Sequence, residues 1–137
     1  GSYLIPTFVG FYLIEFILNN NHINISPYYI ASVLWYPAFE NLFSISRRIS
    51  KKNNVSSPDN RHLHQLIFLF FRSKNLICDK YLNTTSSIII LTFNLPTFIS
   101  SSLLMTHSQI LVFIIFANMI LYVLIYNFIS KNLKFKK

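Results

Sequence analysis

Charged side chains are scarce in this sequence of 137 residues, where they make up only 12% of the composition. Soluble domains carry about 25% charged residues, so an ordinary soluble composition is excluded. Glycine occurs only twice, whereas there are fourteen phenylalanines and eight tyrosines. Abundant aromatic residues with few charges are typical of lipid-facing helices and of the aromatic belts at membrane surfaces. The composition therefore predicts an integral membrane protein.

Acidic residues are rarer still, with four Asp and Glu against twelve Lys and Arg, which gives a net charge of +8. Nucleic-acid-binding domains can be this basic, but they carry their basic residues on a soluble face. Here every Lys and Arg falls within residues 47–80 or 131–137, next to apolar runs. This distribution is typical of a membrane topology signal, so we predict no nucleic-acid partner. The lone cysteine, Cys78, excludes an intrachain disulfide.

Four apolar runs predict an all-α polytopic membrane protein with four transmembrane helices. The predicted spans are residues 3–18, 27–46, 84–105 and 109–129. The first is short for a hydrocarbon core about 30 Å thick. Pro37 should kink the second span and Pro96 the third. Because the chain opens on Gly1 and an apolar run begins almost at once, we expect it to be the carboxy-terminal part of one multi-span domain in a longer protein.

The basic residues also predict an orientation. The loop 47–83 contains eight Lys and Arg and the tail 130–137 contains four, whereas loops 19–26 and 106–108 contain none. Since cytoplasmic loops are enriched in Lys and Arg, the basic loop and the tail should be cytoplasmic, most simply at a bacterial inner membrane. Within that loop, residues 62–72 are too short to span and predict a helix in the membrane interface or partly buried against the bundle.

The loop opens with a long polar run, R-R-I-S-K-K-N-N-V-S-S-P-D-N-R-H-L-H-Q-L, at residues 47–66. In one interpretation, this run sets the membrane topology and attracts anionic lipid headgroups. Each basic residue near the surface then contributes about 1 kcal/mol to membrane binding. A second interpretation is a metal site of His62, His64 and Asp59, although two histidines are too few for a closed site. In the third, Arg61, His62 and His64 hold phosphate oxygens, because arginine and protonated histidine donate charge-assisted hydrogen bonds.

The motif S-P-D-N-R-H-L-H-Q-L at residues 57–66, preceded by P-A-F-E at residues 37–40, resembles a cytoplasmic loop of the polyprenyl-phosphate sugar-1-phosphate transferases. That family includes undecaprenyl-phosphate N-acetylglucosamine-1-phosphate transferases and phospho-N-acetylmuramoyl-pentapeptide transferase. Its bacterial members commonly read P-x-F-D and then S-P-D-x-x-H-x-H-H. Here Glu40 replaces the usual Asp and Gln65 replaces the third His. The resemblance covers about residues 1–72, and the remaining spans are similar only as hydrophobic helices.

This resemblance implies transfer of a sugar 1-phosphate from a UDP-sugar to a polyprenyl phosphate, with release of UMP, in cell-envelope polysaccharide biosynthesis. The implied phosphate-binding residues are Arg61, His62 and His64, and the implied supporting residues are Asp59, Gln65, Arg47 and Arg48. Mg²⁺ is the implied cofactor. The family's metal-binding and catalytic aspartates occur in motifs that this sequence lacks, so they are expected upstream. The chain alone should hold no catalytic residue and no metal, and it should be inactive.

The implied partners are the lipid bilayer, polyprenyl phosphate, a UDP-sugar and a second copy of the chain. An alternative function is that of a non-catalytic small membrane protein, or a fragment of a transporter, whose basic loop only binds lipid headgroups. A transporter should place polar residues at mid-span. Only Asn94 and Asn118 approach that position.

Overall fold

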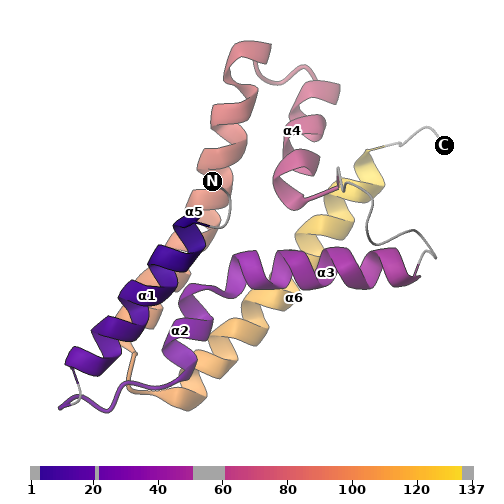
Figure 1. Cartoon of the computed structure of the whole chain (residues 1–137). Helices are drawn as coiled ribbons and strands as arrows, with labels where there is room; N and C mark the ends of the chain where they lie inside the picture. The colour runs from indigo at the N-terminus through magenta and orange to yellow at the C-terminus, as the bar shows by residue number, and fades with distance from the viewer. Residues whose placement is uncertain (1–3, 21, 51–60, 134–137) are drawn as a thin grey trace.

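The computed structural model describes residues 4–20, 22–50 and 61–133. Within these residues every regular element is helical, which confirms the predicted all-α class. The helices are α1 (Leu4–Asn19), α2 (Tyr28–Val33), α3 (Trp35–Ser50), α4 (Leu63–Ser73), the 3₁₀ turn η1 (Asp79–Tyr81), α5 (Leu82–Leu103) and α6 (Ser108–Asn132). Figure 1 shows their arrangement.

Two helical segments are long and apolar enough to cross a membrane. They are Asp79–Leu103, which joins η1 to α5, and Ser108–Asn132, each 25 residues long. Within an apolar stretch of 18 residues in each segment, only 22% of Asp79–Leu103 and 11% of Ser108–Asn132 is buried within the protein. The core helix of a soluble protein would be mostly buried, so these helices fit a membrane better. They coincide with the predicted spans 84–105 and 109–129.

One face of α6 shows this exposure clearly. Large apolar side chains recur every three or four residues and are more than half exposed: Phe113, Phe116, Ile120, Leu124 and Phe128. Monomeric soluble proteins rarely expose so long an apolar stripe. Lipid would cover it without cost, because a hydrocarbon environment suits such side chains. The shorter helix α1 is 16 residues long and covers residues 4–18 of the first predicted span, 3–18. The first of the four predicted spans therefore stays a prediction.

The helix predicted over 27–46 with a kink at Pro37 is instead divided at Leu34 into α2 and α3. The predicted kink at Pro37 is displaced towards the amino terminus. A proline inside a helix leaves the carbonyl four residues earlier without a partner. Breaking at Leu34 places Pro37 in the first turn of α3, where its missing N–H costs nothing. Since α3 continues to Ser50, the predicted loop 47–83 also begins inside a helix.

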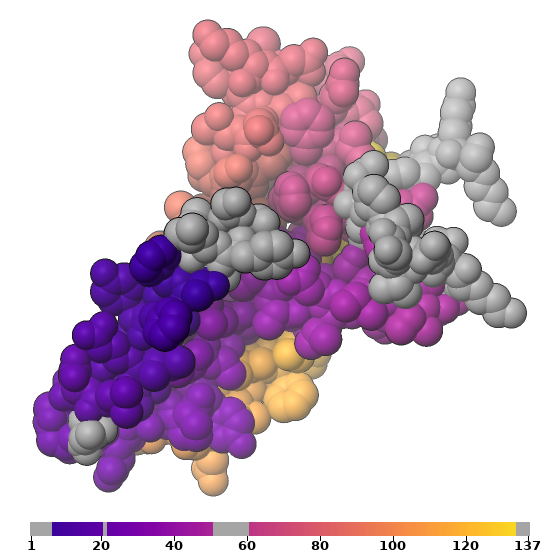
Figure 2. Space-filling view, in the orientation of Figure 1, coloured from indigo at the N-terminus to yellow at the C-terminus, as the bar shows by residue number. Residues whose placement is uncertain are grey.

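Helices α5 and α6 diverge from the turn that joins them (Figure 1). Helix α2 contacts both of them near this turn, and α4 contacts both nearer the open end. Helix α3 leaves α2 at a steep angle and lies across the front of α6, as Figure 2 also shows. The break at Leu34 therefore sends the basic end of α3 towards the carboxy-terminal part of α6.

The core lies where α3, α4 and α6 meet. Its buried members are Trp35, Leu63, Leu66, Ile67, Tyr122, Tyr126, Ile129 and Leu133. Leu66 is fully buried, so α4 uses its apolar face to pack against the other helices. A helix is thus present where the sequence predicts one over 62–72. Its buried face fits the alternative in which it packs against the bundle, whereas its position at a membrane surface stays a prediction.

Helix α5 begins at Leu82, and no side chain caps it. In the interior of α5, close to Pro96, the side-chain amide of Asn94 donates to the Ile90 carbonyl at 2.8 Å. That carbonyl lies one turn before Asn94 in the same helix, so Asn94 bonds locally instead of bridging the proline.

Candidate functional site: the histidine end of helix α4

The candidate site is built around the start of α4, where two histidines flank a buried leucine. His62 precedes the helix in an extended conformation (φ −69°, ψ 153°), and its backbone N–H donates to Gln65 Oε1 at 3.2 Å. Leu63 is only 1% exposed. Because Leu63 anchors the first turn in the core, the side chains on either side of it are held at the surface of the bundle. The local sequence thus determines that both histidine side chains leave the backbone at the surface of the bundle.

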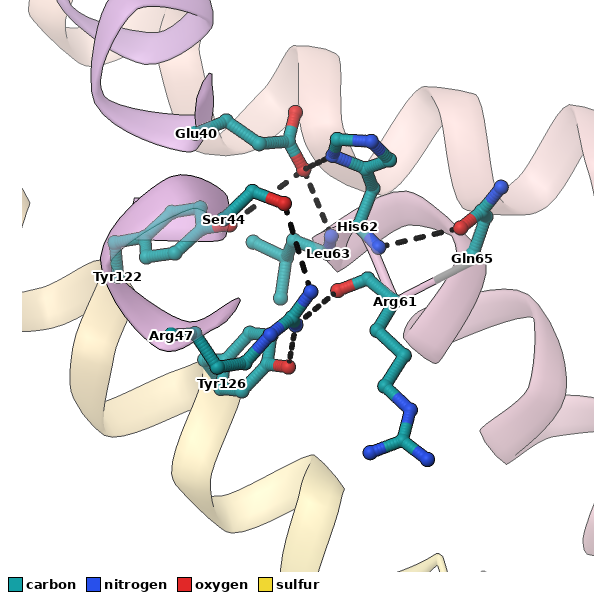
Figure 3. Close-up of polar contacts among 9 residues, drawn as sticks. All are labelled: Glu40, Ser44, Arg47, Arg61, His62, Leu63, Gln65, Tyr122 and Tyr126. Carbon is teal, nitrogen blue, oxygen red and sulfur yellow. Dashed lines mark hydrogen bonds and ion pairs between the residues drawn. The ribbon is translucent and has the colours of Figure 1, made fainter. Parts of the chain in front are cut away.

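Glu40 of α3 binds this first turn from outside α4. Its Oε1 accepts the Leu63 backbone N–H at 2.7 Å, and the Tyr122 hydroxyl of α6 lies 3.5 Å from the same oxygen. The first N–H groups of a helix have no partner within the helix. A carboxylate is favourable there because the helix amino terminus carries a partial positive charge. Glu40 is therefore a cap supplied by another helix (Figure 3).

The same carboxylate faces a histidine. Glu40 Oε1 lies 3.8 Å from His62 Nδ1, an ion-pair distance that exceeds a hydrogen bond. The Glu40 side chain is 12% exposed and that of His62 is 27% exposed. In Figure 3 the other ring nitrogen of His62 lies on the far side of the ring from Glu40. One edge of the imidazole is thus turned to the Glu40 carboxylate, and the other edge faces away from it.

His62 and His64 are brought together. Their rings are nearly parallel, with an interplanar angle of 11° and centroids 5.9 Å apart. His64 lies at the edge of two pockets. One, of about 540 Å³, is lined by His64, Gln65, Phe68, Leu69 and Asn83. The other, of about 390 Å³, runs along α5 from Glu40 and His64 to Asn94 and Phe98 and is mostly apolar. A ligand with a polar head and an apolar chain matches this combination.

Tyr36 of α3 lines the apolar pocket together with Glu40. Its hydroxyl adds a polar group to the wall of the pocket.

Arg47, a predicted supporting residue, has a structural role. Its guanidinium donates to the Tyr126 hydroxyl of α6, to the Arg61 carbonyl at 2.8 Å and to Ser44 Oγ at 3.5 Å. It also stacks over the Tyr126 ring, 5.5 Å from the centroid. These contacts tie the end of α3 to α6 and to the segment that enters α4. Arg47 thus positions the histidines and does not face the pockets that they line.

The other predicted site residues fall in different places. The side chain of Arg61 extends away from His62 in Figure 3, and it is exposed. Gln65 holds the His62 backbone, as described above. Arg48 lies beside Arg47 in the last turn of α3. Asp59 lies outside the described residues, as does most of the polar run before it. The predicted phosphate site therefore has two adjacent members, His62 and His64.

Sequence reasoning did not place Glu40 in the site, although the P-A-F-E motif contains it. The sequence did contain one signal for Glu40, because an acidic residue in an apolar segment is rare and needs a partner. Nothing local identified that partner, because Glu40 and Leu63 lie 23 residues apart. Tyr122 and Tyr126 were missed for the same reason, since they belong to a helix that reads as uniformly apolar.

The described residues do not form a metal centre, because they contain no group of three His, Cys, Asp or Glu side chains that could hold a metal ion. Residues 4–20, 22–50 and 61–133 therefore provide no site that fits Mg²⁺. Comparison with known protein families, curated proteins and solved structures finds no match to this chain. The geometry of the site is consequently the basis for assigning a function.

Proposed function

We propose that this chain forms the phosphate-binding, membrane-embedded part of a transferase that moves a sugar 1-phosphate from a UDP-sugar to a polyprenyl phosphate. The observation that carries the proposal is the pair of parallel imidazoles of His62 and His64, held at the start of α4 beside an apolar pocket. The resemblance of residues 37–66 to the polyprenyl-phosphate transferases supplies the reaction. The proposal covers the acceptor lipid as well, because the pocket that extends from His64 along α5 is mostly apolar.

In this mechanism the histidines bind and neutralise phosphate oxygens. Phosphoryl transfer needs little covalent chemistry from the protein, and its rate depends mainly on positioning and on stabilising charge. His62 and His64 present N–H donors, and Arg61 is proposed as the third donor. The Leu63 N–H is already bonded to Glu40, so the side chains and not this amide must hold the anion. The catalytic aspartates and metal ligands are expected outside this chain.

The arrangement of the loops supports the proposed topology. Ser26 of one neutral loop donates its N–H to the Met105 carbonyl at 2.8 Å, and its hydroxyl lies 2.8 Å from that of Ser108. Both neutral loops are therefore at one end of the bundle. Arg47 bonds to Tyr126 near the other end of α6. We propose that this second end, with loop 47–83 and the tail, faces the cytoplasm at the bacterial inner membrane.

The native thiol can test this orientation. Cys78 is exposed and lies in the basic loop. In intact cells it should resist a membrane-impermeant thiol reagent and react only after the membrane is opened. A Cys78→Ser protein that carries Thr106→Cys, in the neutral loop, should react in intact cells. The opposite pattern would contradict the proposed topology, and labelling of both positions in intact cells would contradict a membrane barrier between them.

The reaction itself is tested by the release of UMP. With Mg²⁺ in the buffer, the full-length protein that contains this chain should release UMP from a UDP-N-acetylhexosamine when polyprenyl phosphate is present. The purified 137-residue chain should release none, because it lacks the metal-binding and catalytic aspartates of the family. UMP release by the chain alone would show that these aspartates are not needed. No release by the full-length protein with any UDP-N-acetylhexosamine would contradict the proposed transferase.

A non-catalytic role in binding lipid headgroups is the second candidate, and the far end of α4 favours it. Arg72, Lys74 and Lys80 are exposed there. Arg72 is 4.0 Å from Asp79, but both side chains are well exposed, so this pair is weak. Basic side chains at a membrane surface attract anionic lipids by about 1 kcal/mol each. This role needs the positive charge alone and makes no use of the ordered histidines.

A further inference from the structure

We propose that Glu40 is a positioning residue that acts through His62, in addition to capping α4. This inference rests on the proposed phosphate-binding role of His62. It assigns a task to the acid of the P-A-F-E motif, which lies 23 residues before the helix that it contacts. Its physical basis is that one carboxylate oxygen meets both the backbone and the imidazole at the start of α4.

The carboxylate is itself held in place. It belongs to α3, it is 12% exposed, and Tyr122 of α6 approaches the same Oε1 at 3.5 Å. The Leu63 N–H bond at 2.7 Å adds a contact from α4. Three helices therefore determine where the negative charge lies. Such a charge can orient a neighbouring ring, because it does not have to be ordered when the ligand binds.

The orientation of the ring follows from this charge. A carboxylate held beside one nitrogen of a histidine orients the ring and turns its other nitrogen away from the carboxylate. With Nδ1 turned to Glu40, the other ring nitrogen lies on the far side of the ring from the carboxylate (Figure 3). A doubly protonated ring then donates from that nitrogen to a phosphate oxygen, in a charge-assisted hydrogen bond. Without the carboxylate, the ring would lose the contact that orients it.

Capping and positioning can be separated, because only positioning requires the His62 side chain. A glutamine at position 40 can still accept the Leu63 N–H through its amide oxygen, but it carries no charge. We therefore expect Glu40→Gln to keep α4 and to weaken the binding of a diphosphate. Glu40→Asp keeps the charge and shortens the side chain by one methylene, so it should bind the diphosphate within about threefold of the wild type.

The test is a double-mutant cycle of Glu40→Gln and His62→Asn in the full-length protein, with UDP as the probe and calorimetry as the measurement. Each single variant should weaken UDP binding by about tenfold, within the range of coupling between residues in contact. The double variant should bind UDP no more weakly than His62→Asn does. A residue that only caps α4 would instead give independent losses, which multiply in the double variant.

The outcomes distinguish this inference from the proposed function. If His62→Asn weakens UDP binding and the two losses multiply, Glu40 does not act through His62, and the phosphate site stands. If His62→Asn leaves UDP binding unchanged, both proposals are overturned. Thermal unfolding of each variant shows whether α4 is retained. Should Glu40→Gln not fold, Tyr122→Phe takes its place in the cycle, because it removes the hydroxyl near Glu40 Oε1 and leaves His62 intact. Coupling of the same sign is expected there, and its absence would overturn the inference.

Discussion

Replacing His62 by alanine in the full-length protein should lower kcat/KM for UMP release by about 30- to 1,000-fold. Removing one charge-stabilising donor at a reacting centre costs about 2–4 kcal/mol. His64→Ala should have a loss of the same order, because its ring stacks beside that of His62 and lines both pockets. Arg61→Ala should have a loss of the same order, because Arg61 is proposed as the third phosphate donor. Initial rates at several UDP-sugar concentrations would measure these losses.

Lys74→Ala is the matched control. Lys74 is exposed and lies at the opposite end of α4 from His62. It therefore carries a positive charge next to the same helix without lying beside the histidines. Its loss should cost well under tenfold, because exposed charges are screened by salt. Small and equal losses in all four variants would contradict a phosphate site and favour the lipid-headgroup role. Membrane insertion must be equal among the variants for the comparison to hold.

Replacing Trp35 by alanine should lower the free energy of unfolding by about 3–5 kcal/mol, the usual range for truncating a buried aromatic side chain. Trp35 is 2% exposed at the first position of α3. Its ring meets Tyr36 and Phe93 edge-on, with centroids 5.8 Å away in both cases. The cavity would open where α3 meets α5, so the break at Leu34 would lose its support. Denaturant unfolding in detergent, followed by helical circular dichroism, would measure the change.

Two further variants show whether the loss comes from the core. Trp35→Phe should cost less than about 1.5 kcal/mol, because it keeps most of the volume. It also removes the indole N–H, which is buried and has no hydrogen-bond partner among the described residues. Phe116→Ala removes an aromatic side chain that is 60% exposed on α6. It should cost much less than Trp35→Ala. Equal losses for these two alanine variants would show that Trp35 is not a core residue.

The sequence determined the helical class and the position of the two long apolar helices. Residues 84–105 and 109–129 predict spans, and α5 and α6 cover them to within a few residues. Length and hydrophobicity are local properties, and a long apolar run satisfies its backbone within one helix. The short helix after the basic run was also predicted, because residues 62–72 form an apolar segment that is too short to span a membrane. The site histidines were found by their motif alone.

The tertiary structure decided what holds those histidines. Glu40 meets Leu63 across 23 residues, Arg47 meets Tyr126 across 79, and Tyr122 approaches Glu40 across 82. No periodicity specifies such pairs, because each depends on how α3 crosses α6 after the chain breaks at Leu34. The break removes the conflict between Pro37 and a continuous helix, which is a local effect. The direction in which α3 continues is set by the packing around Trp35. The sequence by itself therefore determined which residues are available for chemistry, and the packing of α3, α4 and α6 decided which of them meet.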